Sequence, residues 1–314
     1  MPMRAFLFPG QGSQSPGMGK TLAEASAAAK SVFEEVDDAL SQKLSTLMFE
    51  GPADELTLTA NAQPAIMAHS LAVLRVMEAE AGLVLSERAA FVAGHSLGEY
   101  SALCAAGSLN LADTARLLRV RGDAMQAAVP VGEGAMAALL GLSFEDAMAA
   151  AREATTAEEI CVAANDNADG QVVVSGHKAA VERAIEAAKA KGAKRGMLLP
   201  VSAPFHSPLM QPAADKMQEA LAAASFDAPT VPVVTNVTAA PETDPDRLKQ
   251  LLVEQVTGTV RWRESILAMA AAGVEEFVEL GAKVVGPMVK RITPDAEPIS
   301  IVTMADIESW AKRL

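Results

Sequence analysis

Short apolar runs alternate along this chain with longer stretches in which apolar residues recur at helical spacing. Residues 4–10, RAFLFPG, and residues 88–96, RAAFVAGHS, are apolar runs bounded by Gly or Pro, which predicts buried strands. Helical spacing predicts helices over residues 21–49, where we expect a break, and over 63–81 and 110–128. Strands that alternate with helices predict an α/β fold, a parallel sheet with helices on both faces.

The middle of the chain has a different order of elements. It reads strand, helix, strand, strand, helix, strand, which is the ferredoxin-like order. Ser143 is the expected N-cap of the first of these helices, and a hairpin is expected around residues 165–170. We therefore expect a small inserted subdomain over residues 131–202, within a large one made of residues 1–130 and 203–314. The elements expected in the insert are residues 134–142, 143–155, 160–166, 171–176, 178–193 and 194–202.

In the last third of the chain, predicted strands again alternate with predicted helices, as in the first third. The expected helices are residues 207–226 and a pair within 246–274 that is broken at Gly258, and the expected strands are 232–239, 275–281 and 297–302.

Charge and composition exclude several classes of function. The net charge is −13, whereas a nucleic-acid-binding domain presents a basic face. Cys104 and Cys161 form neither a metal-ligand pattern nor a disulfide framework. No stretch of about 18 uncharged apolar residues could span a membrane, and the first ten residues have too short an apolar run for a signal peptide. We expect a cytoplasmic monomer without metal or cofactor.

Residues 94–98, Gly-His-Ser-Leu-Gly, match the pattern Gly-x-Ser-x-Gly. A strand, this turn and a helix together form the setting of a nucleophile elbow. Ser96 would lie at the start of a helix, where free N–H groups and the positive end of the helix dipole favour an oxyanion. The alternative is an ordinary solvent-facing serine in a Gly-rich turn.

A serine nucleophile needs a base, and the chain has four histidines. His69 is expected to pack within a helix, His95 to point away from its neighbour Ser96, and His177 to cap a helix or face solvent. His206 lies in a loop stiffened by prolines on both sides, and rigidly held loops favour catalytic residues. We select His206 by elimination, with a structural loop histidine as the alternative.

No carboxylate stands out as the group that orients this base. Five aspartates lie between Ser96 and His206 in chain order, and none belongs to a distinctive motif. They are Asp113, Asp123, Asp146, Asp166 and Asp169. The orienting group could equally be a backbone carbonyl.

Five segments together resemble the malonyl-CoA:acyl carrier protein transacylase family. They occur in the family's order and span almost the whole chain: FPGQGSQ (8–14), GHSLGEYSAL (94–103), Arg121-Gly122 followed by Met-Gln, the run 165–176 that ends in GQVVVSG, and FHSPLM (205–210). The resemblance implies a hydrolase-like large subdomain with a parallel sheet and an inserted ferredoxin-like small subdomain. It also implies malonyl transfer from malonyl-CoA to the phosphopantetheine thiol of acyl carrier protein, for fatty acid synthesis.

The resemblance also implies roles for individual residues. Ser96 would carry the malonyl group, and His206 would be the general base and acid. The backbone carbonyl of Gln255 would hold the imidazole, which would explain why no aspartate stood out. Arg121 would bind the free malonyl carboxylate. The other implied positions are the oxyanion-hole N–H groups of Gln11 and Leu97, and Asn165 and Asn167 as polar residues near the cleft.

Physical chemistry supports a cation for the malonyl carboxylate, because burying an unpaired carboxylate is very costly. Arg offers a planar two-pronged donor that matches this group. The alternative for Arg121 is a helix-surface cation, since Arg116 and Arg119 lie nearby and only the family motif selects it. Leu97 and Phe205 flank the two catalytic residues, and bulk there would crowd an α-methyl branch; simple packing is the alternative for both.

Three rival functions remain open on sequence alone. They are an acyltransferase for another acyl-CoA or a polyketide pathway, a serine esterase or thioesterase, and a non-catalytic acyltransferase-like domain. An acidic carrier protein would need a local basic patch on this acidic chain. The candidates are Lys189, Lys191, Lys194 and Arg195 in the insert, and Lys283, Lys290 and Arg291 near the C-terminus.

Overall fold

The apolar runs of the first and last thirds come together in one six-stranded sheet of the computed structural model, which describes residues 2–201 and 203–313. The strand order is β10-β9-β1-β2-β7-β8, and all pairs are parallel except β7 with β8. The strands are β1 (Arg4–Phe8), β2 (Phe91–Gly94), β7 (Val233–Val234), β8 (Pro241–Glu242), β9 (Glu276–Leu280) and β10 (Glu297–Ile301).

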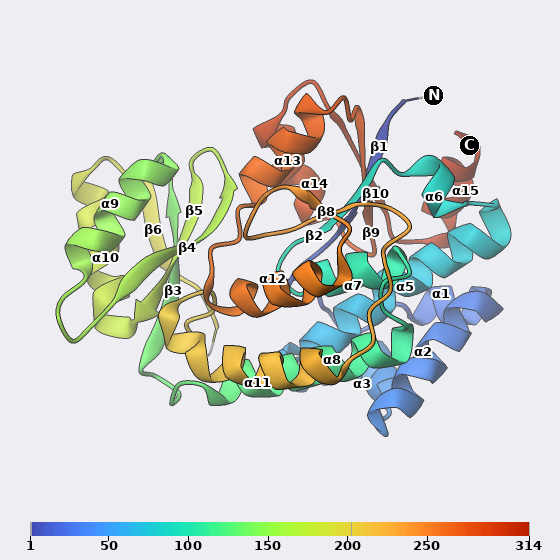
Figure 1. The fold of residues 1–314 in the computed structure, drawn as a ribbon, viewed down its shortest axis with the longest axis horizontal. Coiled ribbons are helices and arrows are strands. Elements are labelled where there is room, and N and C mark those ends of the chain that lie inside the picture. Colours follow the sequence, from blue (N-terminus) through green and yellow to red (C-terminus); the bar gives the residue numbers. More distant parts are fainter. Residues whose placement is uncertain (1, 202, 314) are drawn as a thin grey trace.

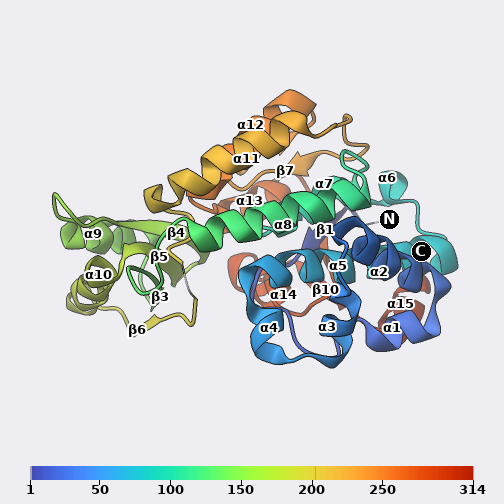
Figure 2. The same cartoon turned by 90° about the horizontal axis from the view of Figure 1, so that it is seen from below.

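Helices cover both faces of this sheet, as the alternating pattern predicts (Figures 1 and 2). Phe6 and Phe8 of β1 face the larger helical layer, whereas Ala5 and Leu7 pack on the opposite side with α13 and α14. Because successive side chains of a strand point to opposite faces, β1 contributes to the apolar cores on both sides of the sheet. The helices outside the insert are α1 (Lys20–Ala25), α2 (Ala27–Leu40), α3 (Leu44–Glu50), α4 (Ala53–Thr57), α5 (Thr59–Ala81), α6 (Leu85–Arg88), α7 (Gly98–Ala105), α8 (Leu111–Ala127), α11 (Gln211–Ala223), α12 (Pro245–Thr257), α13 (Trp262–Ala271), α14 (Val285–Ile292) and α15 (Met304–Ala311), with a 3-10 turn, η1, at Pro208–Met210.

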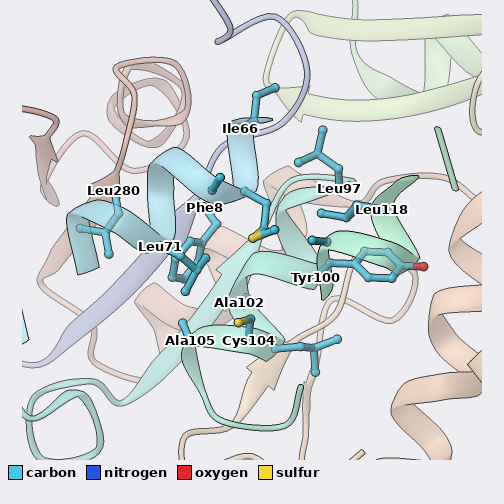
Figure 3. Packing of buried hydrophobic residues seen from close by; sticks show 14 of the residues in the cluster. Phe8, Ile66, Leu71, Leu97, Tyr100, Ala102, Cys104, Ala105, Leu118 and Leu280 are labelled. Atoms are coloured by element: carbon cyan, nitrogen blue, oxygen red, sulfur yellow. The ribbon is translucent and has the colours of Figure 1, made fainter. Parts of the chain in front are cut away.

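Helix α7, which follows the Gly-x-Ser-x-Gly motif, is buried along its whole length. Figure 3 shows its Tyr100, Ala102 and Cys104 among apolar side chains from other elements. Burial raises the pKa of the Cys104 thiol to about 11. Cys104 is therefore a core residue, held as a neutral thiol.

The middle of the chain forms a second sheet with the expected order of elements. Its strand order is β4-β5-β3-β6 and every pair is antiparallel. Two helices pack on it around a separate apolar core, at the left of Figure 1. Ser143 caps the first of them, as expected, and accepts from the N–H of Asp146. The elements are β3 (Gly134–Leu140), α9 (Phe144–Ala154), β4 (Cys161–Ala168), β5 (Gln171–His177), α10 (Lys178–Ala190) and β6 (Arg195–Leu198).

The limits of the insert, residues 131 and 202, stay a prediction, and Ser202 lies outside the described residues. None of the helices in the described ranges is both long and apolar enough to cross a membrane.

The expected hairpin around residues 165–170 is confirmed by the antiparallel pairing of β4 with β5, but its turn is shorter, because strand β4 continues to Ala168. The strand is irregular, with register shifts between Ala163 and Asn165 and between Asp166 and Ala168. Its other edge pairs with the large subdomain, where the N–H of Asp166 donates to the carbonyl of Val260. This second partner keeps the polar segment extended and sets it against the large subdomain.

The expected strand over residues 232–239 is also too long, because only Val233 and Val234 pair as a strand. The chain then turns, and the N–H of Ala239 donates to the carbonyl of Thr235. Asn236 is placed in this turn, beside the end of β2.

Candidate active site

Ser96 lies in a sharp turn between the end of β2 and the start of α7. Its φ angle is 54°, a left-handed conformation that is rare for a residue with a side chain. A Cβ on Gly94 would lie 1.9 Å from the backbone of Gly98, and a Cβ on Gly98 would lie 2.4 Å from the carbonyl of Phe8. Both glycines are therefore required by close backbone contacts, which explains the spacing of the motif.

His206 contacts Ser96 directly, although 110 positions separate them. Its Nε2 lies 2.8 Å from Ser96 Oγ, and its Nδ1 lies 2.9 Å from the carbonyl oxygen of Gln255. A carbonyl only accepts, so Nδ1 carries the proton and Nε2 is free to accept from the serine. Asp166, one of the aspartates considered above, pairs with Arg263 at 2.9 Å instead.

The surroundings of His206 keep its ring neutral. The ring is buried, and burial together with the positive charge of Arg121 lowers its pKa to about 3. An imidazole with such a pKa is unprotonated at neutral pH, so the lone pair of Nε2 is free to accept a hydrogen bond from Ser96.

Arg121 is buried in the same place, with 1% of its surface exposed. Its Nη1 donates to Oε1 of Gln63 at 2.8 Å, and its Nη2 donates to Ser96 Oγ at 3.0 Å and to Oε1 of Gln255 at 2.9 Å. Within the described ranges, no carboxylate forms an ion pair with it and its Nε has no hydrogen-bond partner. A buried guanidinium beside Ser96 that no carboxylate contacts directly is suited to bind an anionic substrate.

The neighbouring arginines are held elsewhere. Arg116 pairs with Asp113 on the surface, and Arg119 donates to Gln42 and Asn61. The interpretation of Arg121 as a helix-surface cation is therefore wrong, because its helix turns this one side chain inward.

A pocket of about 350 Å³ joins most of the predicted site residues. Gln255 contributes from behind this pocket, where it is fully buried. Val285 and Met288 of α14 line the pocket from the large subdomain, a contribution that the sequence analysis missed. The predicted residues on its wall are Gln11, Ser96, Leu97, Arg121, Asn165, Asn167, Phe205 and His206.

The side chains of the three other histidines have other partners, although His95 also lines the pocket. His95 Nε2 lies 2.8 Å from Oδ1 of Asn167 and its ring meets the edge of Trp262, so it turns away from Ser96. His69 is packed within α5, where burial lowers its pKa to about 4. His177 precedes α10 and accepts from the N–H of Ile160. Of the four, His206 alone contacts the serine in this structure.

Sequence reasoning missed three polar residues, Gln63 on the wall of the pocket and Asn236 and Glu99 behind it. Asn236 Oδ1 accepts from the N–H of Ser96 at 2.8 Å, and its Nδ2 donates to the carbonyl of Gly94 at 2.7 Å. Gln63 holds Arg121, and Glu99 contacts both Asn236 and Gln255. Glu99 could have been noticed as a charged residue in an otherwise apolar helix, but no local signal marks Asn236.

Comparison with known proteins agrees with this site. Residues 5–303 match the acyl transferase domain family. The malonyl CoA-acyl carrier protein transacylase of Bacillus subtilis strain 168 is 48% identical over 305 residues, which cover 97% of this chain and 95% of that protein. This chain belongs to the malonyl CoA-acyl carrier protein transacylase family. The Escherichia coli K12 member is 47% identical over 289 residues, 92% of each chain.

Solved structures of family members share the whole fold. The acyl carrier protein S-malonyltransferase of Bartonella henselae superposes with a TM-score of 0.96 at 57% identity, and 99% of each chain is covered. A malonyl transacylase solved in complex with its type II polyketide acyl carrier protein has a TM-score of 0.95 at 39% identity, with 99% of this chain and 100% of that one covered. The hydrolase-like α/β fold expected from the motifs, with its small antiparallel subdomain, is thereby confirmed.

Proposed function

We propose that this enzyme transfers the malonyl group of malonyl-CoA to the phosphopantetheine thiol of acyl carrier protein and so supplies extender units for fatty acid synthesis. One observation carries the proposal: an activated serine and a buried arginine without a carboxylate partner share one pocket. The arginine suits an acyl group that ends in a carboxylate, and the names of the family relatives support the same substrate and acceptor.

In the first half-reaction, His206 accepts the proton of Ser96 while Oγ attacks the thioester carbonyl. The 2.8 Å contact between Oγ and Nε2 and the neutral ring support this role. Arg121 would turn its Nη2 from Oγ to the malonyl carboxylate, and the acyl carbon would then lie beside the serine. CoA leaves as the thiol after His206 returns the proton.

The tetrahedral intermediate needs donors for its oxyanion. We propose the backbone N–H groups of Gln11 and Leu97, because both residues line the pocket and Leu97 directly precedes the first residue of α7. Removal of one such donor typically costs about 3–4 kcal/mol in the barrier. Asn165 and Asn167 line the same pocket from β4 and would contact the substrate as polar neighbours.

In the second half-reaction, the carrier-protein thiol attacks the malonyl-serine ester. His206 takes the thiol proton and then returns a proton to Ser96, so the enzyme is regenerated. Leu97 and Phe205 line the pocket, and we propose that their bulk disfavours an α-methyl branch on the acyl group. We propose the cytoplasm as the place of this reaction.

The test is direct labelling of the protein. Wild-type enzyme mixed with radioactive malonyl-CoA should retain label on Ser96, the Ser96→Ala variant should retain none, and added holo acyl carrier protein should remove the label as malonyl-carrier protein. Loss of the label as free malonate would indicate an esterase instead. No label on the wild-type enzyme would reject the catalytic proposal altogether.

A further inference from the structure

Glu99 is a fully buried carboxylate that the mechanism above does not use. It lies in the first turn of α7, three residues after the nucleophile. Its Oε2 accepts from the backbone N–H of Asn236 and from Nε2 of Gln255, both at 2.9 Å, and its Oε1 has no hydrogen-bond partner. Among the described residues, no cation forms an ion pair with it. Burying a carboxylate without a cationic partner costs free energy, so we expect this group to have a function.

Both partners of Glu99 hold the backbone of the nucleophile. Asn236 accepts from the N–H of Ser96, and Nε2 of Gln255 donates to the carbonyl of Ser96 at 3.0 Å. Ser96 has a left-handed conformation that its own side chain disfavours. Glu99 therefore lies at the centre of the contacts that keep the serine in this conformation.

The acceptor oxygen of Glu99 also selects one orientation of the Gln255 amide. The NH₂ group of that amide faces acceptors, which are Glu99 Oε2 and the Ser96 carbonyl, and its oxygen faces Nη2 of Arg121. The reverse orientation would place the amide oxygen against a carboxylate and the NH₂ group against a guanidinium. Glu99 therefore keeps an acceptor, Oε1 of Gln255, in front of Arg121.

We propose that Glu99 is a positioning residue that acts through the Gln255 side chain to aim Arg121 at the carboxylate of the acyl group. The contacts run from Glu99 Oε2 to Gln255 Nε2, and from Gln255 Oε1 to Arg121 Nη2. Burial raises the pKa of Glu99 to about 7, although the hydrogen bonds from Asn236 and Gln255 and the charge of Arg121 act to lower it. Near neutral pH Glu99 is therefore partly ionised. This role rests on the proposed malonyl transfer and predicts a defect in acyl selectivity.

The experiment compares malonyl-CoA with acetyl-CoA, which has no carboxylate for Arg121. Glu99→Leu removes the acceptor at similar volume, so kcat/KM for malonyl-CoA should fall at least about tenfold further than kcat/KM for acetyl-CoA, the effect of one charged hydrogen bond. Glu99→Gln keeps an acceptor and should restore most of the selectivity. On a Ser96→Ala background, Glu99→Leu should weaken malonyl-CoA binding by about the same factor, measured by calorimetry.

A purely structural role makes a different prediction. If Glu99 only supports the turn at Ser96, both substrates lose the same factor in kcat and the selectivity is unchanged, which overturns the proposal. If Glu99→Leu fails to fold, Glu99→Asp provides the test instead. Its shorter side chain withdraws the carboxylate from Gln255, so kcat/KM should again fall more for malonyl-CoA than for acetyl-CoA. Asp37→Asn is the matched control, a buried carboxylate on α2 that accepts from Ser45 and does not line the pocket. Wild-type labelling of Ser96 tests the underlying function separately.

Discussion

Nη2 of Arg121 lies 3.0 Å from Oγ of Ser96, so the residue proposed to bind the substrate carboxylate contacts the nucleophile itself. A hydrogen bond donated to Oγ withdraws electron density from the atom that must attack. A substrate carboxylate would draw the guanidinium away and would also neutralise its charge beside His206. We therefore expect Arg121 to connect recognition of the acyl group with activation of the serine.

Replacement of Arg121 should abolish the preference for malonyl over acetyl groups. In Arg121→Ala, kcat/KM for malonyl-CoA should fall by about tenfold or more relative to acetyl-CoA, because charged hydrogen bonds contribute about 1.5–3 kcal/mol each. Steady-state kinetics with the two substrates measure this. Arg119→Ala, in the same helix but bonded to Gln42 and Asn61, is the control. An unchanged preference would reject Arg121 as the carboxylate-binding residue.

His206 should not limit the rate at mildly acidic pH. Its pKa of about 3 keeps the ring unprotonated, so kcat/KM for malonyl-CoA should show no loss near pH 6.5 from this group, in profiles from about pH 5 to pH 8. Arg121 and His95 are the charged or titratable groups that lower this pKa besides burial. An inflection near pH 7 would belong to Glu99 and should vanish in Glu99→Gln. A step near pH 6.5 that persists in that variant would contradict the assignment.

His69 should make the fold sensitive to acid. Its pKa is about 4 in the native protein against 6.5 when exposed, so between these values the unfolded chain binds a proton that the native chain does not. The free energy of unfolding therefore falls as pH falls through this window. Between pH 7 and about pH 4.5, wild type should lose on the order of 2–3 kcal/mol more than His69→Gln. Denaturant unfolding at both pH values measures this, and equal losses would be the contrary result.

The structure separates the two basic patches expected to contact carrier protein. Lys290 and Arg291 are exposed at the end of α14, the helix whose Val285 and Met288 line the pocket. Lys189 and Lys191 lie around the end of α10 in the small subdomain and pair with Glu186 and Glu153. The patch on α14 is therefore the better candidate.

Charge reversal at Lys290 and Arg291 should slow transfer to carrier protein while acylation by malonyl-CoA stays intact. The variant is Lys290→Glu with Arg291→Glu, and pre-steady-state kinetics resolve the two half-reactions. Lys189→Glu with Lys191→Glu should leave both half-reactions unchanged. If only this second pair slows transfer, docking takes place on the small subdomain instead.

Local sequence alone predicts most of the elements and the sharp turn at Ser96. The spacing of Gly94 and Gly98 around Ser96 follows from close backbone contacts within one turn. Ser143 caps a helix by accepting from an N–H group only three residues further along the chain. Such contacts are short in sequence, so residue type and spacing encode them. The order of strands and helices likewise separates the parallel sheet from the antiparallel insert.

Only the tertiary structure decides which distant groups meet at Ser96. It places Arg121 rather than Arg119 in the pocket, and it brings Asn236 and Gln255 from elsewhere in the chain to the back of the serine. Motif resemblance anticipated the carbonyl of Gln255, but the contact of its amide with Glu99 has no local signature. The packing of α7, α8 and α12 against one another sets these contacts. These helices are far apart in the sequence, and the pattern within one helix does not determine how it packs on another.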